Sequence, residues 1–321
     1  MQLPKLKKID PTQPIKKKKK ILLLSDDFRL HSGIGTISRE IIFNTIKEYD
    51  WVQLGAALKH PEHGKGVDLS AQIAKETGID DASIKVIPWT GYGDRNILFA
   101  LINQEKPDAI FHFTDPRYWT WLYQLEHEVK TTFGIPIIYY SIWDDLPYPM
   151  WNAPFYGSCD LIMGISKQSD NIHREVLTQN DFKIINYDDK KQRHQFKSSN
   201  TVVTGYVPHG LNHEIFKPLD KSDDSYKKMY KQIKQDNNVD FVLLWNNRNI
   251  RRKQPGDVVL AFKQFVDQLP LEQQKNVALL LHTQADCKIN VDLKMITEIG
   301  YNLMQIILLI IPVNLKIMVI G

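Results

Sequence analysis

The chain has 321 residues, a length that predicts two domains. Hydrophobic residues make up 43% and charged residues 24%, which is typical of a soluble globular protein and argues against a disordered or membrane-embedded chain. The only cysteines, Cys159 and Cys287, are too few and too far apart for a disulfide framework, so the composition fits a reducing, cytoplasmic location.

The net charge of +4 is unevenly distributed. Residues 1–20 contain eight lysines and one acidic residue, a charge of +7, which leaves −3 for the rest of the chain. This run predicts a basic flexible leader; a nuclear signal, or an anchor to anionic lipid or nucleic acid, is the alternative. No apolar stretch long enough for a signal peptide follows it. Polar residues interrupt the apolar segment 302–321, so we expect no stable membrane span.

Short apolar runs recur along the chain, and each precedes a longer amphipathic stretch. This alternation predicts an α/β fold with parallel sheets buried on both faces. We expect a doubly wound N-terminal domain of at least six strands at 21–207, a hinge at 208–220 and a second domain at 221–321. The polar stretch 179–200 predicts a loop or insertion. The apolar runs are Ile21–Leu24, Val52–Ala57, Ile84–Ile87, Ala109–Phe113, Ile135–Ile142, Leu161–Ile165, Val202–Val207, Val239–Trp245 and Val277–His282.

The first candidate site follows the first apolar run, in the segment LLLSDDFRLHSGIGTISREII. A strand is expected to end at Ser25, and a loop with Gly33 and Gly35 precedes a helix that starts near Thr36 or Ser38. Glycines before a helix N-terminus let backbone N–H groups approach an anion, which the helix dipole also favours. The alternative is a tight strand-to-helix turn without a ligand.

Two further candidates follow later strands. In IPIIYYSIWDDLPYPMWN, Trp143, Asp144 and Asp145 combine an aromatic face with carboxylates, which is typical of sugar binding; helix capping and ordinary packing are the alternative. In PDAIFHFTDPRYWTW, His112 lies near a strand end, ahead of Asp115 and Arg117, as a catalytic candidate or as a hydrogen-bonded core histidine.

The fourth candidate is basic. In WNNRNIRRKQPGDVVLAFKQF, Arg248 and Lys253 follow a buried strand and precede an amphipathic helix that opens at Pro255. Two cations beyond a strand end suit a diphosphate, which arginine grips bidentately and lysine binds as a point charge. A solvated basic loop is the alternative. His60 and His63 lack the further ligands that a zinc site needs, so no metal is expected.

Taken in order, these segments resemble retaining glycosyltransferases of the family 4 type, over about residues 21–290. YVPHGLNHEIFKPL resembles that family's hinge signature, and the step from Arg248 to Lys253 and on to Asp257 resembles its phosphate-binding segment. The SGIG of residues 32–35 is similar to its glycine loop, and Asp160–Ser166 to one of its strands. The resemblance implies a GT-B fold, two Rossmann-like domains facing a cleft, and transfer of a sugar with retention from a nucleoside-diphosphate sugar to an acceptor hydroxyl, without cofactor or metal.

The resemblance also implies roles for single residues. The acceptor, whether glycan, lipid, protein or modified nucleic acid, is not specified by it. The expected catalytic residues are Asp144 and His112; the donor-binding residues are Gly33, Gly35, Arg248 and Lys253; and the acceptor or sugar contacts are Trp143, Asp145 and His209.

Three features depart from the family pattern. The position of its catalytic histidine falls on Ile142, Trp143 or Asp144, and its Glu-x7-Glu motif is absent after Lys253. From about Lys288 the sequence becomes rich in Ile, Leu and Asn, as in a truncated or frameshifted gene with an incomplete second domain. Two alternatives to an active transferase therefore remain: a non-catalytic carbohydrate- or nucleotide-binding remnant, and a nucleic-acid-binding protein that uses the lysine leader.

Overall fold

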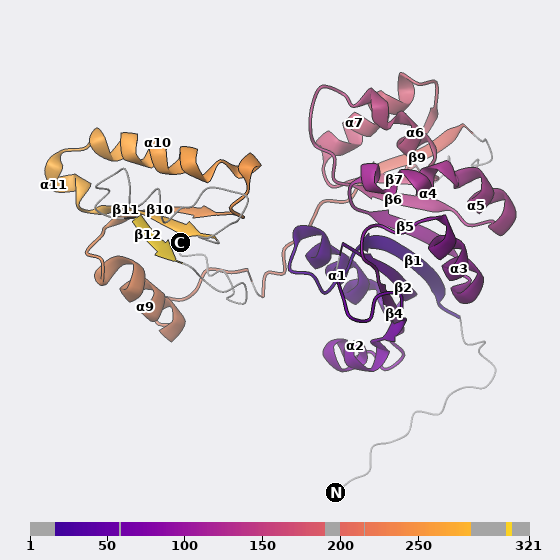
Figure 1. Cartoon of the computed structure of the whole chain (residues 1–321), viewed down its shortest axis with the longest axis horizontal. Coiled ribbons are helices and arrows are strands. Elements are labelled where there is room, and N and C mark those ends of the chain that lie inside the picture. Colours follow the sequence, from indigo (N-terminus) through magenta and orange to yellow (C-terminus); the bar gives the residue numbers. More distant parts are fainter. Residues whose placement is uncertain (1–16, 58, 190–199, 215, 284–305, 310–321) are drawn as a thin grey trace, which may run out of the picture. The chain divides into compact units, whose positions relative to one another are not determined.

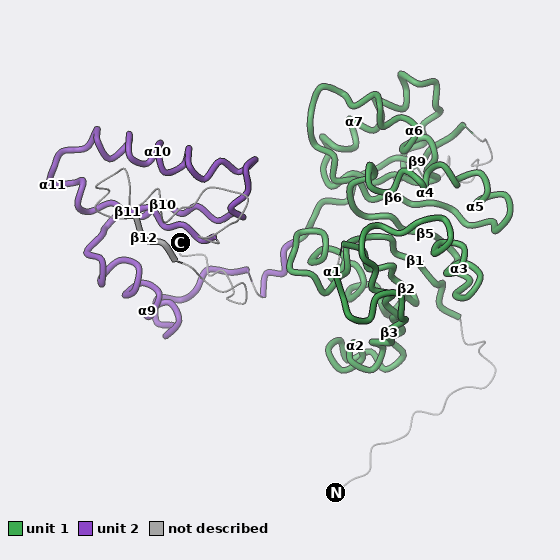
Figure 2. The backbone as a smooth tube through the Cα atoms, in the orientation of Figure 1, with its two compact units in different colours: residues 1–210 green, residues 211–321 purple. Residues whose placement is uncertain are grey.

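The computed structural model describes residues 17–57, 59–189, 200–214, 216–283 and 306–309. The chain forms two compact units, residues 1–210 and residues 211–321 (Figure 2). Each unit is built on a mostly or wholly parallel sheet with helices packed on it (Figure 1), so the predicted α/β fold class is confirmed.

The sheet of unit 1 has nine strands in the order β3-β4-β2-β1-β5-β6-β7-β9-β8. Every neighbouring pair is parallel except the pair of β3 and β4. The strands are β1 (Lys19–Asp26), β2 (Tyr49–Ala56), β3 (Val67–Asp68), β4 (Ile84–Pro88), β5 (Ala109–Phe113), β6 (Ile137–Ser141), β7 (Leu161–Gly164), β8 (Lys183–Asn186) and β9 (Thr201–Tyr206).

Both faces of this sheet are buried, because successive residues of a strand point to opposite faces. In β1, Leu22 and Leu24 belong to one core, and Ile21 and Leu23 to the other. Helices α1 and α2 cover the second core, and α3 to α7 cover the first. The helices are α1 (Gly33–Thr45), α2 (Ser70–Thr77), α3 (Arg95–Glu105), α4 (Thr120–Gln124), α5 (Glu126–Phe133), α6 (Ala153–Gly157) and α7 (Lys167–Thr178), with 3-10 turns η1 (Pro116–Trp119) and η2 (Met150–Asn152).

The predicted leader is too long at its C-terminal end. Strand β1 begins at Lys19, and Lys18 Nζ donates to the carbonyl of Ile46 at 3.0 Å and pairs with Asp81 at 2.9 Å. Lys20 pairs with Glu105 at 3.4 Å. These lysines are fixed because acidic partners at the amino edge of the sheet meet them there.

The segment 179–200, predicted as a loop, contains strand β8. Lys183 to Asn186 pair in parallel with Thr201 to Thr204 of β9. The sequence does not predict this strand because only two of its residues are apolar, as is common for a strand at the edge of a sheet. Residues 190–199 lie outside the described ranges.

Unit 2 contains a parallel sheet in the order β10-β11-β12. Val259 and Phe262 of α10 pack on Leu279 and Leu281 of β11 and cover one face of this sheet. The segment rich in Ile, Leu and Asn that starts at about Lys288 lies outside the described residues, except for 306–309. None of the helices described could cross a membrane by its length and apolarity. The elements are α9 (Asp224–Tyr230), the π-helical turn η3 (Lys231–Gln235), β10 (Phe241–Asn246), η4 (Arg251–Lys253), α10 (Pro255–Asp267), α11 (Leu271–Gln274), β11 (Val277–His282) and β12 (Ile306–Leu309).

Candidate functional site

The strand order of unit 1 marks a place for a ligand. Strand β1 lies between β2 and β5, so the chain leaves β1 toward one side of the sheet and later returns on the other. In open α/β sheets, ligands bind outside the carboxyl ends of the strands at such a reversal. The loops after β1 and β5 are therefore the first place to look for binding residues.

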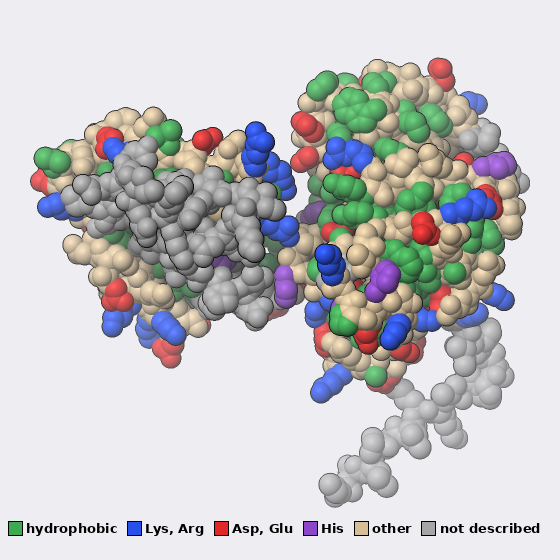
Figure 3. All heavy atoms as spheres, viewed as in Figure 1, with side chains coloured by type: hydrophobic (Ala, Val, Ile, Leu, Met, Phe, Trp, Pro, Cys, Tyr) green, Lys and Arg blue, Asp and Glu red, His purple; other side chains and the backbone are tan. Residues whose placement is uncertain are grey.

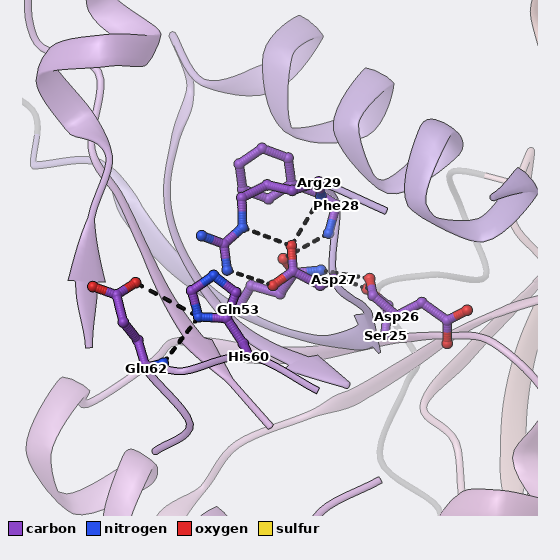
Figure 4. Close-up of polar contacts among 8 residues, drawn as sticks. All are labelled: Ser25, Asp26, Asp27, Phe28, Arg29, Gln53, His60 and Glu62. Carbon is purple, nitrogen blue, oxygen red and sulfur yellow. Dashed lines mark hydrogen bonds and ion pairs between the residues drawn. The ribbon is translucent and has the colours of Figure 1, made fainter. Parts of the chain in front are cut away.

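The loop after β1 is held by buried polar groups (Figure 4). The Asp27 carboxylate is fully buried and accepts two hydrogen bonds from the Arg29 guanidinium, at 2.9 and 2.7 Å. Hydrogen bonding to Asp27 raises the pKa of Arg29. Gln53 of β2 accepts from the backbone N–H of Phe28 at 3.2 Å and donates to the carbonyl of Asp26 at 2.9 Å. The Asp26 side chain points away from the Asp27–Arg29 pair (Figure 4).

Helix α1 begins earlier than predicted, at Gly33 instead of Thr36 or Ser38. Ser32 is its N-cap: the hydroxyl accepts a hydrogen bond from the N–H of Gly35 at 3.0 Å. Several cap-competent residues follow one another here, and the glycines disfavour a helix by propensity alone. The prediction therefore placed the start one turn too late.

The two glycines of this turn have different roles. A Cβ on Gly35 would lie 2.4 Å from the carbonyl oxygen of Leu30, so packing requires glycine, and the Gly35 N–H already donates to Ser32. A Cβ on Gly33 would meet no atom within 4 Å. Gly33 is thus the glycine of the pair whose backbone a ligand can approach at the helix N-terminus.

His112 lies in the core of unit 1. The ring is fully buried, its Nδ1 is 2.6 Å from the Tyr123 hydroxyl, and it stacks on Tyr139 at 5.1 Å between centroids. Burial lowers the pKa of His112 to about 3. This is the geometry of the hydrogen-bonded core histidine, the alternative for this residue, since a substrate has no access to the ring.

Asp144 and Asp145 lie exposed beyond the end of β6. Their backbone is fixed: Gln168 Nε2 donates to the carbonyl of Asp144 at 2.8 Å, and Trp143 Nε1 donates to that of Asp145 at 3.1 Å. One oxygen of the Asp145 carboxylate accepts from the N–H of Leu146 at 2.9 Å. The Asp144 carboxylate is thus presented to solvent from a held backbone.

Residues after β4 and β5 add to the same edge. Arg117 Nε donates to both oxygens of Asp115, at 2.9 and 3.1 Å. Partial burial would raise the pKa of Asp115, but the hydrogen bonds and charge of Arg117 outweigh it and lower that pKa. Burial raises the pKa of Tyr92, and the charges of Asp26 and Asp115 raise it further.

His209 reaches the strands at the reversal. Its ring packs edge-on against Tyr140 at 5.5 Å and against Phe113, the last residue of β5, at 6.1 Å. Partial burial lowers its pKa. The structure thus brings His209 to the end of β5, although the two segments are far apart in the chain.

In unit 2 the candidate cations follow β10. Arg248 is exposed, and Lys253 ends η4, two residues before α10 opens at Pro255. Figure 3 shows Lys and Arg side chains gathered where α10 begins. Two polar residues that the sequence did not single out lie at the same sheet edge: His282 Nδ1 is 2.8 Å from Asn246 Oδ1. Their register in adjacent strands brings them together, which sequence spacing does not show.

In comparisons with known proteins, no protein-family model and no curated protein sequence matches the chain. The N-terminal domain of the Candida albicans trehalose-6-phosphate phosphatase aligns with a TM-score of 0.50 at 12% identity, over 87% of this chain and 67% of that chain. UGT71G1 of Medicago truncatula, complexed with UDP-glucose, aligns with a TM-score of 0.38 at 11% identity, over 88% of this chain and 71% of that chain. The glycosyltransferase of kitacinnamycin aligns with a TM-score of 0.35 at 13% identity, over 83% of this chain and 66% of that chain. The first of these likenesses shows a shared fold.

Proposed function

We propose that this chain is a glycosyltransferase that moves a sugar, with retention, from a nucleoside-diphosphate sugar to an acceptor hydroxyl. The observation that carries the proposal is the basic segment of unit 2, where Arg248 and Lys253 stand between the end of β10 and the start of α10. The hinge-like segment after β9 and the α/β architecture of both units support it.

The donor site rests on the charge of a departing diphosphate. Positioned cations and a helix N-terminus stabilise negative charge that develops in the transition state. Arg248 and Lys253, with the opening of α10 behind them, supply both. The proposal assigns this neutralisation to protein groups and not to a metal ion. In unit 1, the backbone N–H of Gly33 offers a further anion contact.

The acceptor side is the carboxyl edge of the unit 1 sheet. Asp144 presents its carboxylate from a fixed backbone and orients the acceptor hydroxyl or the transferring sugar. Because His112 is enclosed in the core, it acts on this edge only through the packing around Tyr139 and Tyr123.

Titration calorimetry with UDP, GDP and ADP tests the donor site. Arg248→Ala and Lys253→Ala should each weaken the tightest nucleotide at least about tenfold, since a hydrogen bond to a charged group contributes about 1.5–3 kcal/mol. Arg251→Ala is the matched control: it is an exposed cation of the same segment and should change affinity less than about threefold.

A larger loss in Arg251→Ala than in Lys253→Ala would show that the register of the site is wrong. Nucleotide binding without any release of nucleoside diphosphate from the nucleotide sugar would establish the binding-remnant alternative. If none of the three nucleotides binds, the donor site as proposed does not exist in this chain.

A further inference from the structure

Four aromatic side chains lie along the carboxyl edge of the unit 1 sheet. Tyr92 belongs to the loop after β4, Tyr118 to η1 after β5, and Trp143 and Trp151 to the loop and turn after β6. Each therefore follows the carboxyl end of a strand, where this fold places its ligands. We call these four residues, with Asp115 and Arg117, the aromatic platform.

The platform is continuous through its arginine. Tyr92 and Tyr118 stack, with ring centroids 4.7 Å apart and planes 12° apart, and Trp143 meets Trp151 edge-on at 6.2 Å. Arg117 is the chain neighbour of Tyr118, and its guanidinium lies 5.4 Å over the Trp143 ring. One side chain thus joins the two aromatic pairs.

Two side chains of the platform are held by hydrogen bonds, and two others are open to solvent. The Arg117 guanidinium donates hydrogen bonds to the carboxylate of Asp115, which holds it in place. The indole N–H of Trp143 donates to the backbone carbonyl of Asp145. Tyr118 is nevertheless 56% exposed and Trp151 59% exposed. Aromatic rings that are fixed on one side and open on the other bind a partner at a low cost in conformational entropy. An exposed aromatic group of this size is typical of a binding surface.

The charges of the platform narrow down the ligand. The positive charge of Arg117 is neutralised by Asp115, and the neighbouring Asp144 and Asp145 expose carboxylates. A polyphosphate chain or an anionic lipid surface would meet negative charge here and no unpaired cation of the platform. A neutral ligand that has apolar faces and many hydroxyls suits both the rings and the carboxylates.

A pyranose ring has that chemistry: its C–H faces stack on aromatic rings, and its hydroxyls donate to carboxylates. We propose that the aromatic platform binds an oligosaccharide, and that the acceptor of the proposed transfer is therefore a glycan. Only the second part, the identity of the acceptor, rests on the proposed function. Tyr118 and Trp151 are the residues whose exposed rings sugar units cover.

Binding of unlabelled maltohexaose, mannohexaose and chitohexaose to the full chain, measured by calorimetry without nucleotide, tests the platform. At least one of these probes should bind. Tyr118→Ala and Trp151→Ala should each weaken it about fivefold or more, because truncating a central aromatic contact has an effect of that size. Both side chains are more than half exposed, so the variants keep the fold, which circular dichroism verifies.

Tyr49→Ala is the matched control. Tyr49 is also an exposed aromatic residue, 38% exposed, but it begins β2 and so lies at the amino edge of the same sheet. Its removal should leave the affinity unchanged. Failure of all three saccharides to bind, or equal losses in Tyr49→Ala and Tyr118→Ala, would overturn the platform.

A single-stranded oligonucleotide that binds the full chain and loses affinity in Trp151→Ala would equally overturn it in favour of a nucleic-acid surface. The donor proposal is tested separately by the nucleotide titrations. Saccharide binding without nucleotide binding would sink that proposal and leave the platform standing, and the reverse result would do the opposite.

Discussion

Two histidines of unit 1, His112 and His173, are fully buried. His112 is hydrogen-bonded to Tyr123, and the ring of His173 in α7 packs edge-on against Tyr156 at 4.9 Å. Burial lowers the pKa of both to about 3. In the folded chain both rings are therefore neutral at any pH well above 3, whereas an unfolded histidine takes up a proton near pH 6.5.

The sign of the pH dependence follows from these values. Above pH 6.5 neither state is protonated, and the free energy of unfolding does not depend on these residues. As the pH falls from 6.5 toward 3, the unfolded chain binds two protons that the folded chain does not. We expect the free energy of unfolding to fall by about 1.4 kcal/mol per pH unit for each histidine below pH 6. Urea titrations at pH 7.0, 6.0 and 5.0 measure this slope.

His173→Leu gives the control for that slope. It removes one of the two groups, so the slope between pH 6 and 5 should fall by about half, whatever the variant does to stability at pH 7. A slope that is the same in the variant would show that the acid response comes from other groups, such as His209, whose pKa is also lowered.

At the level of single residues, the sequence predicted the place of some residues and missed that of others. Asp144 and Trp143 were identified from their type and their place after an apolar run, and both lie at the carboxyl edge of the sheet. Tyr118 and Trp151 were not, because only the fold brings the segments after β5 and β6 together. The density of aromatic residues in YPMWN and PRYWTW was the available signal.

At the level of elements, burial decided what could be predicted. Strands β5 and β11 are almost wholly apolar runs, because both of their faces are covered, and their extents follow from the sequence. Strand β3 has only two residues and β8 has few apolar ones, so neither shows the apolar run or the alternation of apolar and polar residues that marks a strand. The start of α1 depends on a contact between Gly35 and Leu30 that no local pattern reports.

The amino edge of β1 is anchored by ion pairs of unequal value. Glu105 is only 10% exposed and bonds Lys85 at 2.6 Å and Lys20 at 3.4 Å. Glu105→Gln should lower the free energy of unfolding by about 1.5–3 kcal/mol, because it leaves two partly buried lysines without their acceptor charge. Lys19→Ala is the control: Lys19 is 71% exposed in its pair with Asp108, so the loss should stay within about 0.5 kcal/mol.

Urea denaturation at pH 7 and low salt separates the two variants. In 1 M NaCl the effect of Glu105→Gln should persist for the most part, since salt screens a half-buried pair less than an exposed one. Equal effects of the two substitutions would show that burial does not distinguish these pairs.

At the scale of the whole molecule, each hydrophobic core cluster of the described residues lies within one unit. Unit 1 has both faces of its sheet covered by its own helices, through the clusters around Leu22 and Leu23. Unit 2 has a third cluster around Val259 and Leu279. Because each unit has its own core, a binding site whose residues all come from one unit should work without the other unit.

The two proposed sites divide in this way. The aromatic platform consists of residues of unit 1 alone, and Arg248 and Lys253 belong to unit 2. A fragment of residues 1–210 should therefore fold, with a cooperative urea transition, because its core needs no residue from the other unit. It should bind the best hexasaccharide with an affinity within about threefold of that of the full chain, and it should lose nucleotide binding. Trp151→Ala in the fragment should reproduce the loss seen in the full chain.

A folded fragment that binds nucleotide as tightly as the full chain would place the donor site in unit 1, at Gly33 and the start of α1. A folded fragment that binds no saccharide would show that the platform is completed by unit 2.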